Sequence, residues 1–232
     1  MNGIGSDDAP PPSWRRLHEA AYLLPRAIYG FGHLGARGPE DGPPALVIPG
    51  FIANDRTTME LRRALAADGW RVHPWGQGWN MGATAETIEH LKARMDKISP
   101  DAPMLVVGWS LGGVFARALA LAHPERVTAV VTLGSPFSGD PRANNVWKLY
   151  EMVAGHKVDN PPIERRSDKP HVPTLAIWSR ADGIIAPAAA RGLAEESDRT
   201  VELKCTHMAF GASRRTAGEV VREIHSFLKS VG

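Results

Sequence analysis

One serine in this sequence stands where its hydroxyl could act as a nucleophile. Ser110 is the centre of a G-x-S-x-G pattern that runs from Gly108 to Gly112. A buried apolar run precedes the pattern and a helical pattern follows it directly, which predicts a tight strand-to-helix turn with Ser110 at its tip. Small neighbours make the strained backbone of such a turn possible, and the turn pushes the hydroxyl out above a sheet. The expected chemistry is attack of Ser110 on an acyl carbonyl.

The same turn places the N–H of Leu111 at the start of a helix. Unpaired amide donors and the helix dipole at this position favour a developing negative charge. Ser110 and Leu111 therefore combine a candidate nucleophile with one candidate oxyanion donor. The competing interpretation is a serine at an ordinary turn, because the bare five-residue pattern also occurs by chance.

In this context the motif resembles the α/β-hydrolase superfamily, and within it the small lipases and esterases. The resemblance implies a triad in the chain order serine, acid, histidine. Asp182 follows an apolar run and precedes Pro187, as in the acid loop of the family, and His207 follows the run that begins at Val201. The resemblance thus implies Ser110 as nucleophile, His207 as general base and Asp182 as the acid. A neutral hydroxyl needs such a base, and the acid orients the imidazole and stabilises the imidazolium.

Other residues compete for these roles. Asp140 is the main rival for the acid, because it follows the preceding predicted strand. Three histidines near the upper rim of the expected sheet or in the insertion are rivals for the base: His73, His156 and His171. Taken alone, Asp182 could be a helix-capping residue and His207 an ordinary loop histidine.

The resemblance places the second oxyanion-hole amide in the turn after the first long strand, which reads Pro-Gly-Phe-Ile over residues 49–52. It assigns the N–H of Phe51 as the partner of the N–H of Leu111. A plain Pro-Gly turn is the competing interpretation.

A segment after the fourth predicted strand, TLGSPFSGD, resembles the lipase segment that leads into a lid or an acyl-binding flap. A helical pattern follows, and we expect residues 147–153 to form a small cap that lines an acyl pocket. An ordinary packing helix is the alternative. The candidate substrate-binding residues are Trp109, Ile52, Phe137, Leu149, Met152 and Ile184.

A regular alternation of short apolar runs and helical patterns supplies the elements that position these residues. Strands separated by helices, without hairpin turns, predict crossover connections and a mostly parallel sheet covered by helices on both faces. The predicted fold class is α/β, a minimal α/β-hydrolase fold with about six strands and a short helical cap. The predicted strands are 45–48, 70–73, 103–108, 127–133, 173–178 and 201–203, and the predicted helices are 55–68, 83–98, 111–123, 144–154, 187–196 and 217–231.

We expect the hydrolase domain to span residues 43–232, with a cap insertion at about 135–171. Residues 1–42 are predicted to form a tail and a helix over 14–29 that packs on the domain. The alternative for this helix is peripheral contact with a membrane surface. The N-terminus has no basic and apolar export signal, which predicts a cytoplasmic protein.

The composition excludes several classes of protein. The chain has 232 residues, 43% of them hydrophobic, which favours one domain with a substantial core. The formal charge of +2 is too small to attract a polyanion, so no nucleic-acid partner is expected. The single Cys205 permits neither an internal disulfide nor a cysteine-based zinc site. The longest apolar runs fall far short of the ~20 residues of a spanning helix.

The predicted activity is hydrolysis of a small-molecule or lipid-like carboxylic ester through an acyl-enzyme intermediate, with no metal and no cofactor. A thioesterase, a polyester depolymerase or an acyltransferase with the same triad stays open, because all share that intermediate. A haloalkane dehalogenase is disfavoured, since it needs a carboxylate where this chain has Ser110. A non-catalytic scaffold that binds a ligand is the alternative from another class, and the sequence leaves the oligomeric state open.

Overall fold

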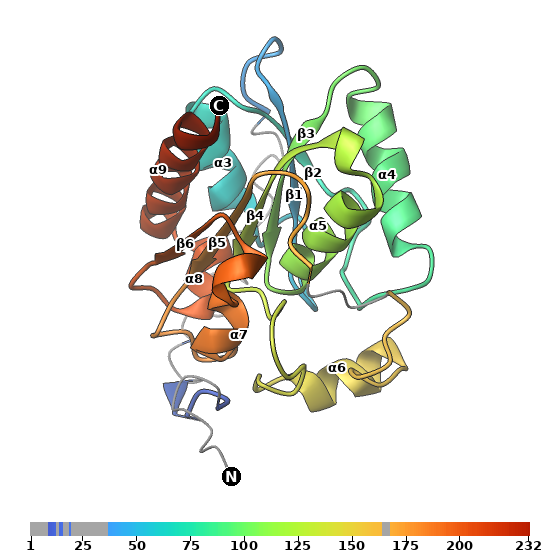
Figure 1. Cartoon of the computed structure of the whole chain (residues 1–232), viewed down its shortest axis with the longest axis vertical. Helices are drawn as coiled ribbons and strands as arrows, with labels where there is room; N and C mark the ends of the chain where they lie inside the picture. Colours follow the sequence, from blue (N-terminus) through green and yellow to red (C-terminus); the bar gives the residue numbers. More distant parts are fainter. Residues whose placement is uncertain (1–8, 13, 16–18, 20–36, 164–167) are drawn as a thin grey trace.

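Six parallel strands form one sheet at the centre of the protein (Figure 1). The structure is a computed structural model that describes residues 9–12, 14–15, 19, 37–163 and 168–232. The strand order is β2-β1-β3-β4-β5-β6, and every neighbouring pair is parallel. This confirms the predicted fold class. The strands are β1 (Pro44–Ile48), β2 (Arg71–Pro74), β3 (Met104–Trp109), β4 (Val127–Leu133), β5 (Thr174–Trp178) and β6 (Arg199–Glu202).

Helices cover both faces of the sheet, so the central strands are apolar on both sides. In β1, Ala45 and Val47 belong to one core cluster while Leu46 and Ile48 belong to the other. The first core lies under α3 (Met59–Ala67) and α9 (Arg214–Val231), and the second lies under α4 (Thr87–Ile98) and α5 (Leu111–Ala122) (Figure 1).

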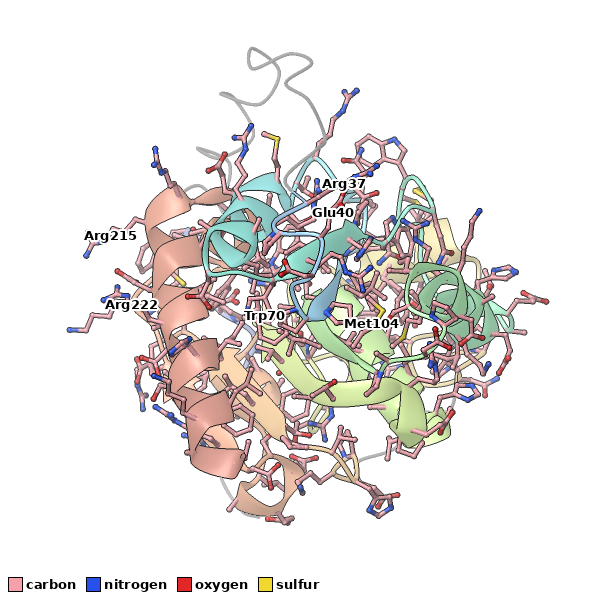
Figure 2. The ribbon with its side chains drawn as sticks, turned by 90° about the horizontal axis from the view of Figure 1, so that it is seen from above. Arg37, Glu40, Trp70, Met104, Arg215 and Arg222 are labelled. Atoms are coloured by element: carbon pink, nitrogen blue, oxygen red, sulfur yellow. The ribbon has the colours of Figure 1, made fainter. Side chains whose placement is uncertain are left out.

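The view from above shows the same layers (Figure 2). Arg215 and Arg222 project from α9 away from the sheet, and the Arg215 side chain is 90% exposed. The polar positions of α9 thus face solvent while Val220 and Ile224 are buried in the core, as expected for a helix that covers one face of a sheet.

Several predicted helix boundaries differ from the structure, and for two of them the structure shows the cause. Asp55 does not start a helix; its carboxylate accepts the N–H groups of Trp75 (3.0 Å) and Gly76 (3.1 Å), and α3 begins four residues later. The sequence does not distinguish an Asp that caps a helix from an Asp that bonds a neighbouring loop. In both cases the carboxylate accepts backbone N–H groups. Pro187 does begin α7 (Pro187–Arg191), but Gly192 ends it at a φ of 73°, and a separate 3-10 turn (Ala194–Glu196) follows.

Two further helices lie at the carboxyl ends of the strands, where ligands bind in open parallel sheets. Within the insertion predicted at about 135–171, α6 (Trp147–Ala154) ends at Gly155 in the left-handed conformation, with a φ of 76°. The short helix α8 (His207–Ala212) was not predicted. His207 is therefore the first residue of a helix, not a loop residue.

The predicted helix over residues 14–29 falls mostly on residues outside the described set. Within the described part of the chain, no helix combines the length and the apolar character needed to cross a bilayer.

Candidate active site

Ser110 occupies a strained turn between β3 and α5. Its φ is 54° and its ψ is −124°, a backbone conformation that costs a residue with a side chain about 1–3 kcal/mol. Two glycines let the strand and helix approach: a Cβ on Gly108 would lie 2.2 Å from the carbonyl oxygen of Gly112, and one on Gly112 would lie 2.3 Å from that of Ile48. The N–H of Ser110 donates to the carbonyl of Leu133 on β4 (2.9 Å), which fixes the turn to the sheet.

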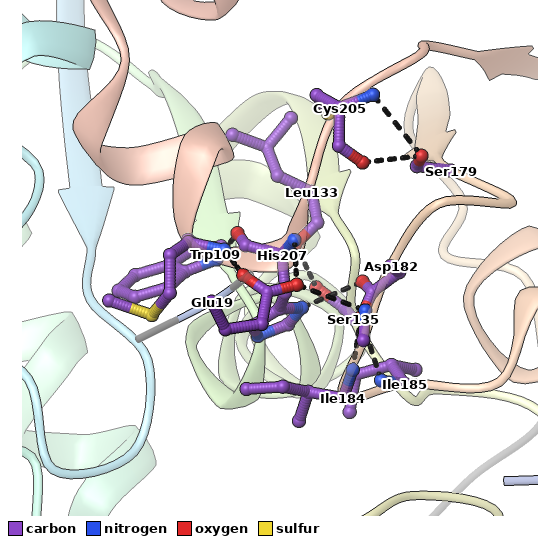
Figure 3. Close-up of polar contacts among 12 residues, drawn as sticks. Glu19, Trp109, Leu133, Ser135, Ser179, Asp182, Ile184, Ile185, Cys205 and His207 are labelled. Atoms are coloured by element: carbon purple, nitrogen blue, oxygen red, sulfur yellow. Dashed lines mark hydrogen bonds and ion pairs between the residues drawn. The ribbon is translucent and has the colours of Figure 1, made fainter. Parts of the chain in front are cut away.

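His207 and Asp182 form a buried pair. The Nδ1 of His207 lies 2.7 Å from Oδ2 of Asp182, and the two side chains are 3% and 1% exposed (Figure 3). Oδ1 of Asp182 accepts the N–H groups of Ile184 (2.7 Å) and Ile185 (2.8 Å). The backbone thus orients the carboxylate and leaves its second oxygen to the imidazole.

The end of β4 connects this pair to Ser110. Leu133 accepts the N–H of Ser110, while a Cβ on the next residue, Gly134, would lie 3.1 Å from Oδ2 of Asp182 and 3.2 Å from Nδ1 of His207. Trp109, directly before Ser110, donates from Nε1 to the carbonyl of His207 (3.1 Å). The structure therefore brings His207 and Asp182 into contact, and it links this pair to the turn of Ser110 through Trp109 and the end of β4.

Opposing effects act on the pKa of His207. Burial lowers it, whereas the charge of Asp182, the hydrogen bond that His207 donates to that carboxylate and the charge of Glu19 raise it. The net result is a pKa above the ordinary value for histidine. The two carboxylates thus outweigh the cost of burying an imidazolium.

The turn after β1 passes against Ser110. A Cβ on Gly50 would lie 3.0 Å from the Cβ of Ser110, and Phe51 lines the same cavity as Ser110 and Leu111. Ile52 has a φ of 49°, which shows that this turn, like the Ser110 turn, is held in a strained backbone conformation. The two segments predicted to supply oxyanion donors therefore flank Ser110.

A cavity opens beside Ser110, between the sheet edge and the insertion. Most of the residues that line it are apolar, and Ser110, Asn144 and Tyr150 are polar members of the lining. Tyr150, the buried residue of α6, packs against Phe51 with ring centroids 5.0 Å apart and ring planes tilted by 59°. The lining residues are Phe51, Ala83, Ser110, Leu111, Val114, Phe115, Pro136, Pro141, Asn144, Val146, Trp147, Tyr150, Val158, Pro161, Ile163 and Ile185.

The six residues predicted to bind substrate lie outside this lining. Three of them are used elsewhere in the fold. Trp109 is buried in the core under α3 and α9, and Phe137 packs beneath the guanidinium of Arg117 at 4.2 Å. Ile184 packs against a small cluster around Trp178, and its neighbour Ile185 faces the cavity instead.

The other three are exposed. Ile52, Leu149 and Met152 are 38%, 40% and 74% exposed. Leu149 and Met152 share one face of α6, whereas Trp147 and Tyr150 share the face toward the cavity. The predicted cap helix is present, but it is apolar on more than one side, so its pattern alone did not show which face lies inward.

The rivals for the acid and base are placed differently. Asp140 is exposed, and its carboxylate accepts the N–H of Arg142. His171 is exposed, and His73 lies on β2 with its pKa lowered to about 4, first by burial and then by nearby arginines. His156 lies near Tyr150 and Ala83, at 3.3 and 3.2 Å. None of these contacts is with Ser110, Asp182 or His207.

Glu19 is a polar residue near this site that the sequence did not single out. Its side chain is 4% exposed, and it accepts hydrogen bonds from the backbone of His207, Met208 and Gly183. Its partners lie 164 to 189 residues away along the chain, so no local signal marks it. Among the described residues, no group of three or more His, Cys, Asp or Glu side chains could hold a metal ion.

The parallel sheet, the strained Ser110 turn and the buried histidine–aspartate pair define a protein of the α/β-hydrolase class. The sequence profile of the alpha/beta hydrolase fold family matches residues 43–160, about half of the chain. The chain belongs to this family, which confirms the resemblance.

One curated relative is the pimeloyl-[acyl-carrier protein] methyl ester esterase of Salmonella heidelberg (strain SL476), which is 47% identical over 60 residues. The matched residues are 26% of this chain and only 23% of that relative, so the match spans about a quarter of the relative's length.

Several solved structures share the fold. A membrane phospholipase A described as a bacterial virulence factor has a TM-score of 0.63 at 15% identity, over 93% of this chain and 92% of the other. A thermophilic esterase from Thermogutta terrifontis has a TM-score of 0.58 at 17% identity, over 80% and 90% of the two chains. An alpha/beta hydrolase enzyme from a sediment metagenome of the Mar Chica lagoon, Morocco, has a TM-score of 0.59 at 20% identity, over 84% and 93%.

Proposed function

We propose that this protein is a serine hydrolase that cleaves carboxylic esters, with Ser110, His207 and Asp182 as its catalytic triad. The observation that carries the proposal is the buried hydrogen bond between His207 and Asp182 beside a serine held at a φ of 54°. A buried imidazole with one nitrogen on a carboxylate has its other nitrogen available to a nucleophile. The curated esterase that is 47% identical over 60 residues supports the reaction class.

In the proposed mechanism, Nδ1–H of His207 donates to Asp182, so Nε2 accepts the proton of Ser110 as its Oγ attacks the ester carbonyl. The N–H groups of Phe51 and Leu111 donate to the oxygen that becomes negative. His207 then protonates the leaving alcohol, and an acyl-Ser110 ester is left. His207 next takes a proton from water, whose oxygen attacks the acyl carbon. The bond from that carbon to the Ser110 oxygen breaks, His207 returns its proton to this oxygen, and the acid leaves.

The acyl part of the substrate is proposed to be apolar. The cavity beside Ser110 is lined mainly by aliphatic, proline and aromatic residues, and such a wall binds hydrocarbon better than charged groups. A hydrolysis panel of p-nitrophenyl esters, from acetate to palmitate, tests this proposal. A thioester and a polyester film in the same panel distinguish the thioesterase and depolymerase alternatives, and an added alcohol acceptor tests acyl transfer.

The pH dependence follows from the charge state that His207 needs. The base must be neutral, and carboxylates near His207 raise its pKa above the ordinary histidine value of about 6.5. We expect kcat/KM to fall as the pH drops through this raised pKa, so that the acid limb lies above 6.5. A pH profile of kcat/KM measures this limb, because kcat/KM reports the free enzyme. A profile that stays flat down to pH ~4 contradicts a histidine base, since that pH is well below any ordinary histidine pKa.

The faces of α6 give a prediction about chain length. Trp147→Ala enlarges the cavity and is expected to shift preference toward longer acyl chains. Each further methylene that the enlarged cavity buries contributes ~0.8 kcal/mol, about fourfold in kcat/KM. The matched variant Leu149→Ala changes a side chain outside the lining and is expected to keep the wild-type profile. The p-nitrophenyl ester series measures both, and a shift confined to the Leu149 variant would reverse the assigned orientation of α6.

A further inference from the structure

A buried carboxylate outside the proposed triad contacts the backbone of the histidine–aspartate pair. Oε1 of Glu19 accepts the N–H of His207 at 2.7 Å and that of Gly183 at 3.0 Å, and Oε2 accepts the N–H of Met208 at 2.8 Å (Figure 3). Gly183 directly follows Asp182. One carboxylate therefore joins the loop that carries the acid to the segment that carries the imidazole.

Neighbouring residues of the N-terminal segment contact the same loop. The side-chain amide of Asn145 donates both to the carbonyl of Pro11 (2.8 Å) and to that of Gly183 (2.9 Å). The guanidinium of Arg15 donates to the carbonyl of Arg180. The contacts of Glu19 are thus part of a set that holds described residues of the N-terminal segment against the loop after β5.

The carboxylate of Glu19 is buried, which carries a desolvation cost. Burying a charged group is unfavourable unless hydrogen bonds offset the lost water, and three N–H donors do so for Glu19. A neutral side chain could accept N–H bonds at a lower desolvation cost. What only the carboxylate adds is a second negative charge, after Asp182, beside His207.

We propose that Glu19 is a positioning residue of this active site. It fixes the backbone of His207 relative to the Asp182 loop, and its charge stabilises the imidazolium that forms when Ser110 is deprotonated. This inference rests on the proposed serine-hydrolase function.

The electrostatics of His207 agree with this role. Burial lowers the pKa of His207, and the carboxylates of Asp182 and Glu19 raise it above the ordinary value. The third titratable group nearby is the Cys205 thiol, whose pKa is raised by burial and by the same two carboxylates, so it stays neutral. Glu19 and Asp182 are therefore the charges that set the pKa of His207 within the described part of the chain.

The first test is Glu19→Gln, which keeps the size of the side chain and one accepting oxygen but removes the charge. Its amide NH₂ then faces the N–H of Met208. The acid limb of kcat/KM is expected to move to lower pH, because His207 loses a nearby negative charge. The plateau kcat is expected to fall about tenfold, short of the ~100-fold that a misplacement of about 1 Å can cost.

Glu19→Asp separates the effect of side-chain length from the effect of charge. This variant keeps the carboxylate but shortens the side chain by one methylene, so it is expected to lower kcat with KM unchanged and to leave the acid limb near its wild-type position. It also carries the test of positioning if the glutamine variant does not fold.

Glu196→Gln is the matched control. Glu196 is also a buried glutamate, 3% exposed, whose carboxylate accepts a backbone N–H, that of Leu193 at 2.6 Å. It does not act on the pKa of His207. Its loss is expected to lower the melting temperature without moving the acid limb. The inference is overturned if Glu196→Gln moves the limb as Glu19→Gln does, or if both Glu19 variants match the wild-type kcat and pH profile.

An NMR titration of isotope-labelled His207 separates this inference from the proposed function. In the Ser110→Ala background, the Glu19→Gln change is expected to lower the pKa of His207. If the wild-type protein hydrolyses no ester and takes up no fluorophosphonate, the proposed function fails, whatever the titration shows. If the wild type is active but this pKa does not change, the inference about Glu19 fails alone.

Discussion

Ser110→Ala is expected to lower kcat for p-nitrophenyl esters by ~10⁶-fold, the size of loss that follows removal of the serine nucleophile in a serine protease. The substitution removes one oxygen, and the backbone bonds of Ser110 to Leu133 and Gly113 do not depend on that atom. Folding is therefore expected to be intact. Circular dichroism and the melting temperature check the fold, and initial rates check the loss.

Stoichiometric labelling by a fluorophosphonate gives the matching direct readout. The wild type is expected to take up one phosphonyl group on Ser110, and the alanine variant none. Labelling that persists in Ser110→Ala would assign the nucleophile to another residue. A wild type that neither reacts nor hydrolyses would favour the non-catalytic scaffold.

Asp182→Asn is expected to lower kcat by ~10⁴-fold, because an amide cannot hold the imidazole in the tautomer that leaves Nε2 free. The present carboxylate is 1% exposed and gives one oxygen to His207 and the other to two backbone N–H groups. An Asn at this position keeps the backbone bonds if its oxygen takes the Oδ1 place, and it then presents NH₂ to His207. Initial rates and the melting temperature of the same samples measure the two effects.

Asp140→Asn is the matched control, because Asp140 is the rival acid in the sequence. Asp140 is exposed and its carboxylate accepts the nearby backbone N–H of Arg142, so a change of less than about twofold in kcat is expected. If Asp140→Asn lost activity and Asp182→Asn did not, Asp140 would be the acid in place of Asp182.

The strands and the Ser110 turn could be predicted because their causes are local. A strand buried on both faces must be apolar throughout, as residues 104–109 are, and a glycine-flanked turn into a helix leaves few other conformations. Asp182 and His207 were predicted from the chain order that the family resemblance implies, together with their positions after apolar runs.

The remaining features depend on contacts between distant residues. The cavity-facing side of α6 is decided by its packing near Phe51, and both faces of that helix carry apolar residues. Ile184 was predicted to bind substrate, but its neighbour Ile185 lines the cavity. A loop has no sequence periodicity that distinguishes inward-facing from outward-facing residues. Glu19 lies in a charged helical pattern whose partners are 164 to 189 residues away, and no rule of spacing connects them.

The conformation of Ser110 has a consequence for how this chain can change over time. About 1–3 kcal/mol of unfavourable backbone energy at one residue is a large share of the stability of an average domain. In every evolved variant that keeps this turn, contacts around Ser110 must offset this unfavourable energy. Gly113 illustrates the restriction, because a methyl group there would lie 1.9 Å from the hydroxyl of Ser135. Residues without a proposed role in the reaction are thus as restricted as Ser110, and mutational tolerance around the turn is expected to follow crowding rather than distance from the Ser110 hydroxyl.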